Sequence, residues 1–439
     1  MNTYFVLFIA YIIAPKIDLV GGGGGGLTIR PEDIISVIAF LIYINKRKQF
    51  PIFIPSAMKI YFIFVGINYA SALLNISSMG ITGFVFATRL LQYALWFFVM
   101  YEACHTISRQ TFHRAFTGIC CIFIVWGSLE FLGLIDRVGQ FAGASSRLTI
   151  NTSGPFETSV MLAMLTYAVP SLLVTPPMLV LVLLTQARIT LVGMVFSFGA
   201  SRPFKAAFGA AVAFILFTVV AQPIMASFQD SRLVKSDSPA RMVNVFVESW
   251  QRAPALDDPS YFRERFLDGP TIFRYMVDTK GDLSFRYRAV RWPIVIKTAV
   301  AAPWHFIVGW SPGAWGTALD NYYVRVFGET GLLGLLAFLV WLGVLLARLR
   351  TAGLAKFSIV MMMIVGCFID IFTSSKVMPI LWAFLALEHA GHSFAFPQRA
   401  RQALRLPRPG NPSLEVDTGR IGVQSRHLVD RIDDEPGWL

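Results

Sequence analysis

Long apolar segments recur along almost the whole chain, and they constrain the fold more than any other feature of the sequence. A helix needs about 20 apolar residues to cross the hydrocarbon core of a bilayer, which is about 30 Å thick. The 439-residue chain is 55% hydrophobic and 15% charged, whereas soluble domains carry about 25% charged residues. The sequence therefore predicts an all-α protein with many membrane-spanning helices.

The apolar runs number about twelve, which indicates a polytopic membrane protein. The first run, "YFVLFIAYIIA", lacks a basic leader and a small-residue cleavage site, so we interpret it as a retained span rather than a signal peptide. The predicted spans lie near residues 1–20, 33–45, 55–75, 83–103, 116–135, 157–174, 176–187, 189–201, 205–222, 322–347, 357–373 and 377–391.

Basic clusters between the spans predict the orientation of the chain, because Lys and Arg are enriched in short cytoplasmic loops. All the clusters fall on the same side of the predicted spans, so we expect both termini to be cytoplasmic. The long loop at about 222–320 then lies on the outer side. The clusters are Lys46 with Arg47 and Lys48, Arg109 with Arg114, Arg202 with Lys205, and Arg348 with Arg350 and Lys356.

This organisation predicts a transmembrane domain at 1–391, with the outer loop inserted between spans, and a tail at 392–439. The tail mixes Pro, Arg and Asp without periodicity, so we expect a disordered cytoplasmic segment. The chain shows no internal repeat, which disfavours transporter folds built from repeated halves. The glycine run at 21–26 follows no predicted strand and is typical of a linker rather than a nucleotide site.

Charge and cysteine content exclude several classes of protein. The net charge is +12, from 38 Lys and Arg against 26 Asp and Glu. Because the basic residues cluster between apolar spans, orientation and anionic membrane lipids explain them, and we predict no nucleic-acid partner. The four cysteines have no CxxC spacing, so neither a disulfide framework nor a metal site is predicted.

An arginine separates two short apolar runs in "LLTQARITLVG". An arginine at membrane depth costs about 2.5–3.5 kcal/mol on insertion scales, which favours a functional role for Arg188. Its fork of N–H donors suits a phosphate or diphosphate. The alternative is an arginine whose charged end simply reaches the lipid headgroups.

A second basic cluster closes the outer loop in "SFRYRAVRWPIVIKTAVAAPW", with Arg286, Arg288, Arg291 and Lys297. We expect a helix at the membrane interface, with Arg288 and Trp292 on one face because they are four residues apart. Pro293 predicts a kink or a helix start at that point. Alternatively, the cluster rests on lipid headgroups and binds no substrate.

Polar residues stand at the start of a long apolar segment in "LDNYYVRVFGETGLLGLLAFLVWL". Asp320 and Asn321 both suit a helix cap, which requires only one of them. Arg325 and Glu329 are four residues apart and are predicted to form a structural pair. The glycines at 328, 331 and 334 fit close helix packing. Asp320 is the carboxylate best placed for chemistry.

Four segments in chain order carry a family resemblance: "RLTINTSGPF", "LLTQARITLVG", "RAVRW" and "GWSPGAWGTALDNYYVRVFGETGLLG". Together they resemble the O-antigen polymerase and ligase superfamily of bacterial envelope glycan enzymes, over about residues 30–390. The stretch "LTIRPEDI" is also similar to the family's early outer loop.

The resemblance implies a C-type glycosyltransferase-like fold of about twelve spans in the bacterial inner membrane. It implies transfer of a glycan from a polyprenyl-diphosphate-linked oligosaccharide on the outer face, with no metal and no cofactor. Arg188 matches the family's arginine at the short-span junction, and Arg288 matches the arginine four residues before a tryptophan. Asp320 stands where ligases typically have a histidine, which favours a polymerase of O-antigen or exopolysaccharide repeat units.

We therefore predict catalytic roles for Asp320, Arg288 and Arg188. Asp320 would act as a base or position the attacking hydroxyl, and the arginines would hold the diphosphate. The predicted substrate-binding residues are Arg286, Arg291, Arg147, Asn321 and Tyr322.

Other functions are compatible with the same pattern. A ligase would transfer the glycan to a lipid acceptor, and a transporter or flippase of lipid-linked sugars could use the same arginines. A scaffold protein of polysaccharide assembly is a third alternative. Expected partners are the lipid-linked donor, membrane lipids and a chain-length regulator or another assembly protein.

Overall fold

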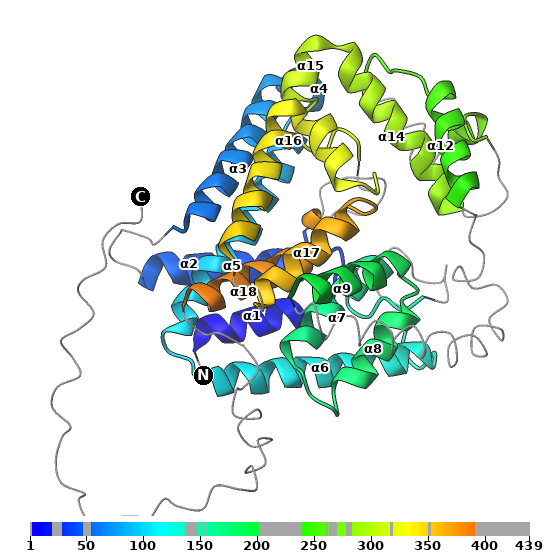
Figure 1. The fold of residues 1–439 in the computed structure, drawn as a ribbon. Coiled ribbons are helices and arrows are strands. Elements are labelled where there is room, and N and C mark those ends of the chain that lie inside the picture. The colour runs from blue at the N-terminus through cyan, green and yellow to red at the C-terminus, as the bar shows by residue number, and fades with distance from the viewer. Residues whose placement is uncertain are drawn as a thin grey trace, which may run out of the picture. The chain divides into compact units, whose positions relative to one another are not determined.

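The computed structural model describes residues 2–19, 29–46, 54–136, 147–152, 154–201, 239–259, 262, 270–277, 283–316, 319–349 and 353–390. Within these ranges the chain forms helices and no β-strand, which confirms the all-α class (Figure 1). The predicted span at 205–222, the glycine run, the predicted tail and parts of the outer loop lie outside them.

Four of the described helices are long and apolar enough to cross a membrane, which supports a membrane protein. The count of about twelve spans stays a prediction. The four are α3 (Ser56–Leu74), α5 (Thr82–Cys104), α6 (Arg109–Phe131) and α16 (Tyr322–Arg348). Shorter apolar helices are α1 (Thr3–Ile13), α8 (Thr175–Leu184), α9 (Arg188–Ser201), α17 (Leu354–Gly366) and α18 (Val377–His389). The others are α2 (Pro31–Lys46), α4 (Ile76–Met79), α7 (Pro155–Ala168), α12 (Pro239–Arg252), α14 (Leu283–Ala301), α15 (Pro303–Val308), η2 (Pro270–Arg274) and η3 (Ile371–Thr373).

The predicted span near 357–373 differs from the structure in its second half. Helix α17 ends at Gly366, and residues 367–376, "CFIDIFTSSK", form turns around η3. We call residues 367–376 the α17–α18 connection. Its polar side chains bond to other helices. Such non-helical backbone is tolerated at membrane depth only where protein surrounds it.

Helices distant in sequence pack side by side, with α3 beside α16, α5 beside α18 and α9 beside α17 (Figure 1). Aromatic residues fill some of these contacts. The ring of Tyr61 in α3 lies 5.0 Å from Trp341 in α16 and 4.8 Å from Trp382 in α18. Each ring pair is worth about 0.5–1.5 kcal/mol beyond the area it buries.

Contacts at the helix ends show which ends of the helices lie together. At one set of ends, Lys46 of α2 lies 5.3 Å from the ring centroid of Tyr4 in α1, and Glu388 of α18 accepts a hydrogen bond from the start of α17. At the opposite set, Lys376 before α18 donates to the carbonyl of Ala14 after α1 at 2.6 Å. We call this second set the polar end. It comprises the ends of α1 and α17 and the starts of α16 and α18.

Helix α16 breaks at Gly331, where φ is 64° and ψ is −164°. Glycine is required there, because a Cβ would overlap the backbone of α15. Near the break, the carbonyls of Gly328 and Glu329 accept hydrogen bonds from the backbone N–H groups of Trp310 and Ser311, at 3.1 and 2.9 Å. These bonds join the loop after α15 to the first turns of α16, where the polar residues lie.

Candidate active site at the start of helix α16

Asn321 caps helix α16, so capping does not engage the carboxylate of Asp320. The Asn321 Oδ1 accepts a hydrogen bond from the N–H of Val324 at 3.0 Å, and its Nδ2 donates to the carbonyl of Cys367 at 2.9 Å. Asp320 has a φ of 60°, a left-handed conformation that Asp adopts more readily than most residues. The two candidate caps therefore have different roles.

Arg288 and Asp320 form a loose ion pair. The Arg288 Nε lies 3.6 Å from the Asp320 Oδ2, which is too long for a hydrogen bond. Their side chains are 10% and 27% exposed, so Asp320 is the more accessible partner. The Arg288 Nε is buried and has no hydrogen-bond acceptor among the described residues. A buried N–H donor beside a partly exposed carboxylate can engage an incoming polar substrate.

Helix α14 presents Arg288 to this site. Trp292, one turn along α14, donates its indole N–H to the carbonyl of Leu319 at 3.1 Å, which confirms that both residues share one face. Of the two alternatives predicted at Pro293, the helix start is wrong, because α14 continues through the proline to Ala301, and the kink stays a prediction. Buried residues on both sides of the proline belong to the same hydrophobic cluster as Trp315; they include Val290, Ile294 and Val295.

Asp370, in the α17–α18 connection, organises the site, and the sequence did not single it out. Its Oδ2 accepts hydrogen bonds from the backbone N–H groups of Leu319 and Asp320, at 3.0 and 3.1 Å. The same oxygen accepts from the Arg325 Nη2 at 2.9 Å. A lone carboxylate inside the predicted span 357–373 was the available signal, since ionisable residues in apolar runs are rarely incidental.

The predicted pair of Arg325 and Glu329 is confirmed. The Arg325 Nη1 donates to the Glu329 Oε1 at 3.0 Å, and the same oxygen accepts from the N–H of Gly313 at 2.9 Å. Arg325 is therefore held between Glu329 on its own helix and Asp370 from another segment. This buried arrangement fixes the first turns of α16 against both neighbouring loops.

Burial and nearby arginines shift the pKa of Asp320 in opposite directions. Burial raises the pKa of Asp320, and Arg288 beside it opposes the rise. Asp370 raises this pKa further, whereas Arg291 and Arg325 lower it. The net effect is a pKa above the usual aspartate value. A carboxylate with this balance is a better proton acceptor than an exposed aspartate.

The other predicted substrate-binding residues near this pair are mostly buried. Arg286 is fully buried in α14, and the guanidinium of Arg291 lies 5.1 Å from the ring centroid of Tyr287. Tyr322 packs between the rings of Phe338 and Phe372, each 5.0 Å away. Substrate contact by these three residues stays a prediction.

Arg147 and Arg188 lie in a second group around the junction of α8 and α9. The predicted short-helix junction is present, and Arg188 is the first residue of α9, half-buried. Arg147 donates its Nε to the carbonyl of Thr185 at 2.9 Å and lies 4.4 Å from the ring centroid of Phe156. The structure thus brings Arg288 to Asp320 and Arg147 to the junction that carries Arg188.

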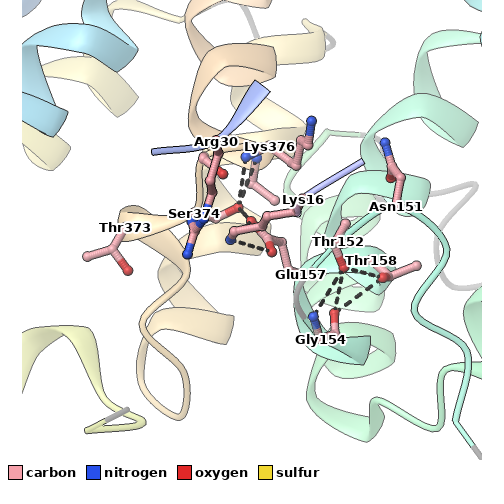
Figure 2. A network of polar contacts seen from close by, with 12 residues as sticks. Lys16, Arg30, Asn151, Thr152, Gly154, Glu157, Thr158, Thr373, Ser374 and Lys376 are labelled. Atoms are coloured by element: carbon pink, nitrogen blue, oxygen red, sulfur yellow. Dashed lines mark hydrogen bonds and ion pairs between the residues drawn. The ribbon is translucent and has the colours of Figure 1, made fainter. Parts of the chain in front are cut away.

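A buried polar network holds the helix ends next to this second group (Figure 2). Glu157, at the start of α7, pairs with Lys16 at 2.9 Å and accepts a hydrogen bond from Ser374. Asn151 donates to carbonyls at the end of α1, at 2.7–3.3 Å. Lys376 donates to the carbonyls of Tyr11 and Ala14. The α17–α18 connection therefore links this network, through Ser374, to the Arg288–Asp320 pair, through Asp370.

No protein-family model matches this chain, and no curated protein matches it either. Among the residues that the structure describes, no three His, Cys, Asp or Glu side chains are grouped as a metal site requires.

Proposed function

We propose that this protein is a glycosyltransferase that polymerises polyprenyl-diphosphate-linked oligosaccharide repeat units into O-antigen or exopolysaccharide. The proposal places the reaction on the outer face of the bacterial inner membrane, in a C-type-like fold of about twelve spans with both termini cytoplasmic. The observation that carries it is the loose pair of Arg288 and Asp320, in which a buried N–H donor without an acceptor among the described residues faces a partly exposed carboxylate.

In the proposed reaction, Asp320 and the two arginines have different roles. Asp320 accepts the proton of a sugar hydroxyl, whose oxygen then attacks the anomeric carbon of the donor glycan. The bond between that carbon and the diphosphate oxygen breaks, and the polyprenyl diphosphate leaves with its electron pair. Arg288 and Arg188 stabilise the negative charge that develops on the leaving group. The proposal includes no metal or cofactor.

The grouping of helix ends at the polar end supports the proposed location. The helix ends gathered at the polar end are those that the basic loops predict to lie on the outer side. Donor lipids reach such a site from within the bilayer, and a partly exposed Asp320 is accessible to a sugar hydroxyl from the aqueous side.

Deletion of the gene, followed by complementation, tests the reaction in the host. We expect wild-type protein to restore polymer, whereas Arg288→Ala leaves single repeat units on the carrier. Arg252→Ala is the matched control, because Arg252 is an exposed arginine in α12 paired only loosely with Glu248, at 3.9 Å. Lipid-linked and extracellular glycans are compared by gel electrophoresis and mass spectrometry.

Other outcomes assign other functions. Full-length polymer that stays on the carrier and never reaches a lipid acceptor identifies a ligase. Loss of all outward-facing intermediates identifies a flippase. Unchanged glycans in the deletion strain contradict all three functions.

A further inference from the structure

One oxygen of Asp370 receives three hydrogen bonds, two of them from consecutive backbone N–H groups. Leu319 and Asp320 donate at 3.0 and 3.1 Å, and Arg325 donates at 2.9 Å. Consecutive N–H groups that converge on one anion form a concave nest. Asp320 has a left-handed φ of 60°, and Asp370 binds the backbone N–H on one side of this torsion and Arg325 of α16 on the other.

We propose that Asp370 is a positioning residue that holds the backbone of Asp320 in this conformation and so directs the Asp320 carboxylate towards Arg288. The inference rests on the proposed function, because it concerns the residue assigned there as the base. Asp370 acts through Asp320 and does not itself touch the substrate.

The position of Asp370 is itself fixed from two sides. Arg325, to which it is paired, is almost fully buried and is also bound by Glu329 at 3.0 Å. On the other side, Ser374 binds Glu157, and Ser375 donates to Glu32 at 2.6 Å. The α17–α18 connection is therefore anchored at both ends. Through its hydrogen bonds, Asp370 in turn holds the loop before α16 in place.

The charge of Asp370 provides a signature that a purely structural role lacks. The charged groups acting on Asp320 are Arg288 and Arg291 from α14, Arg325 from α16 and Asp370 from the α17–α18 connection. Asp370 is the carboxylate in this set, and its charge raises the pKa of Asp320. Removal of that charge should therefore lower the pKa of Asp320.

The test uses the purified full-length protein with polyprenyl-diphosphate-linked repeat units, and it measures kcat and KM against pH. Asp370→Ala removes the acceptor and should lower kcat by about 100-fold with little change in KM, as expected for a misplaced catalytic group. Asp370→Asn keeps an acceptor oxygen, so it should retain more activity and shift the acidic limb of the profile to lower pH. Asp136→Asn makes the same change at an exposed position and is the control.

A double variant distinguishes positioning from general structural support. In an Asp320→Asn background, adding Asp370→Asn should cause no further loss of kcat, because Asp370 acts through Asp320. A wild-type profile for Asp370→Asn, or equal further loss in the double variant, overturns the inference. If Asp320→Asn itself keeps the wild-type rate and profile, the proposed function fails instead. Asp370→Asn remains informative if Asp370→Ala does not fold.

Discussion

Lys376 and Glu32 face each other with both side chains fully buried, at 3.5 Å between Nζ and Oε2. Lys376 also donates to the carbonyls of Tyr11 and Ala14, at 2.7 and 2.6 Å, and Glu32 accepts from Ser375 at 2.6 Å. The pair thus joins the starts of α2 and α18 to the end of α1. A buried charge pair of this kind is costly to break from one side only.

Lys376→Met should destabilise the protein by about 3–5 kcal/mol, because it leaves the Glu32 carboxylate buried without its cation. Adding Glu32→Gln should recover part of this loss, since the double variant buries no uncompensated charge. Thermal unfolding of the detergent-purified proteins measures both effects. Equal unfolding temperatures for Lys376→Met and the wild type would show that the pair contributes nothing.

Gly331→Ala should destabilise the start of α16 by at least about 1–3 kcal/mol, because an L residue there adopts a strained positive φ and its Cβ overlaps α15. Gly343→Ala is the matched control in the same helix, since a Cβ at Gly343 meets no atom within 4 Å. Protease sensitivity and thermal unfolding compare the two variants. Equal stability of Gly331→Ala and Gly343→Ala would contradict the requirement for glycine at position 331.

Arg288→Ala should lower the rate of glycan transfer by about 10²–10³-fold, the usual cost of removing one donor to a developing anion. Arg288→Lys keeps the charge and loses the planar fork, so we expect an intermediate loss. Initial rates with purified protein and lipid-linked repeat units test this order, with Arg252→Ala as control. Full activity of Arg288→Ala excludes a role in binding the leaving group.

The rate of transfer should increase with pH through the pKa of Asp320, because the base must be deprotonated to accept a proton. Burial raises this pKa above the ordinary aspartate value, and Arg291 is among the charges that lower it. Arg291→Gln should therefore move the acidic limb of the rate profile to higher pH. If the Asp320→Asn variant keeps the same acidic limb in its rate profile, that limb reports the titration of another group.

The raised pKa of Asp320 also affects the stability of the folded protein. A folded-state pKa above the unfolded value means that Asp320 contributes stability below the unfolded pKa and loses it as pH rises through the folded pKa. Asp320→Asn should consequently unfold at a higher temperature than the wild type at neutral pH, because the variant lacks this partly buried charge. A lower unfolding temperature there would indicate that the ion pair with Arg288 outweighs burial.

Local features of the site were predictable from the sequence, because they involve residues one helical turn apart. The start of α16, the pair of Arg325 and Glu329, and a cap from Asp320 or Asn321 all follow from spacing and residue type. The loose pair of Arg288 and Asp320 joins two predicted catalytic residues, although their contact depends on how α14 packs.

Long-range features could not be predicted in this way. Asp370 lies in an apolar run that resembles a continuous span, and its partners belong to the loop before α16 and to α16 itself. Ser375 and Glu32 are 343 positions apart, so their contact has no local signal. The break at Gly331 is similar: three glycines indicate close packing, and the structure alone identifies which one interrupts the helix.

Lengthening of lipid-linked glycan by the purified protein tests the central claim most directly. Wild-type protein and Asp136→Asn, incubated with polyprenyl-diphosphate-linked repeat units, should each convert single units into a ladder of carrier-linked products. Asp320→Asn should leave most of the single units unchanged under the same conditions, with a slow residual rate. A wild-type reaction that yields single units only, or an Asp320→Asn reaction with the wild-type ladder, contradicts the account.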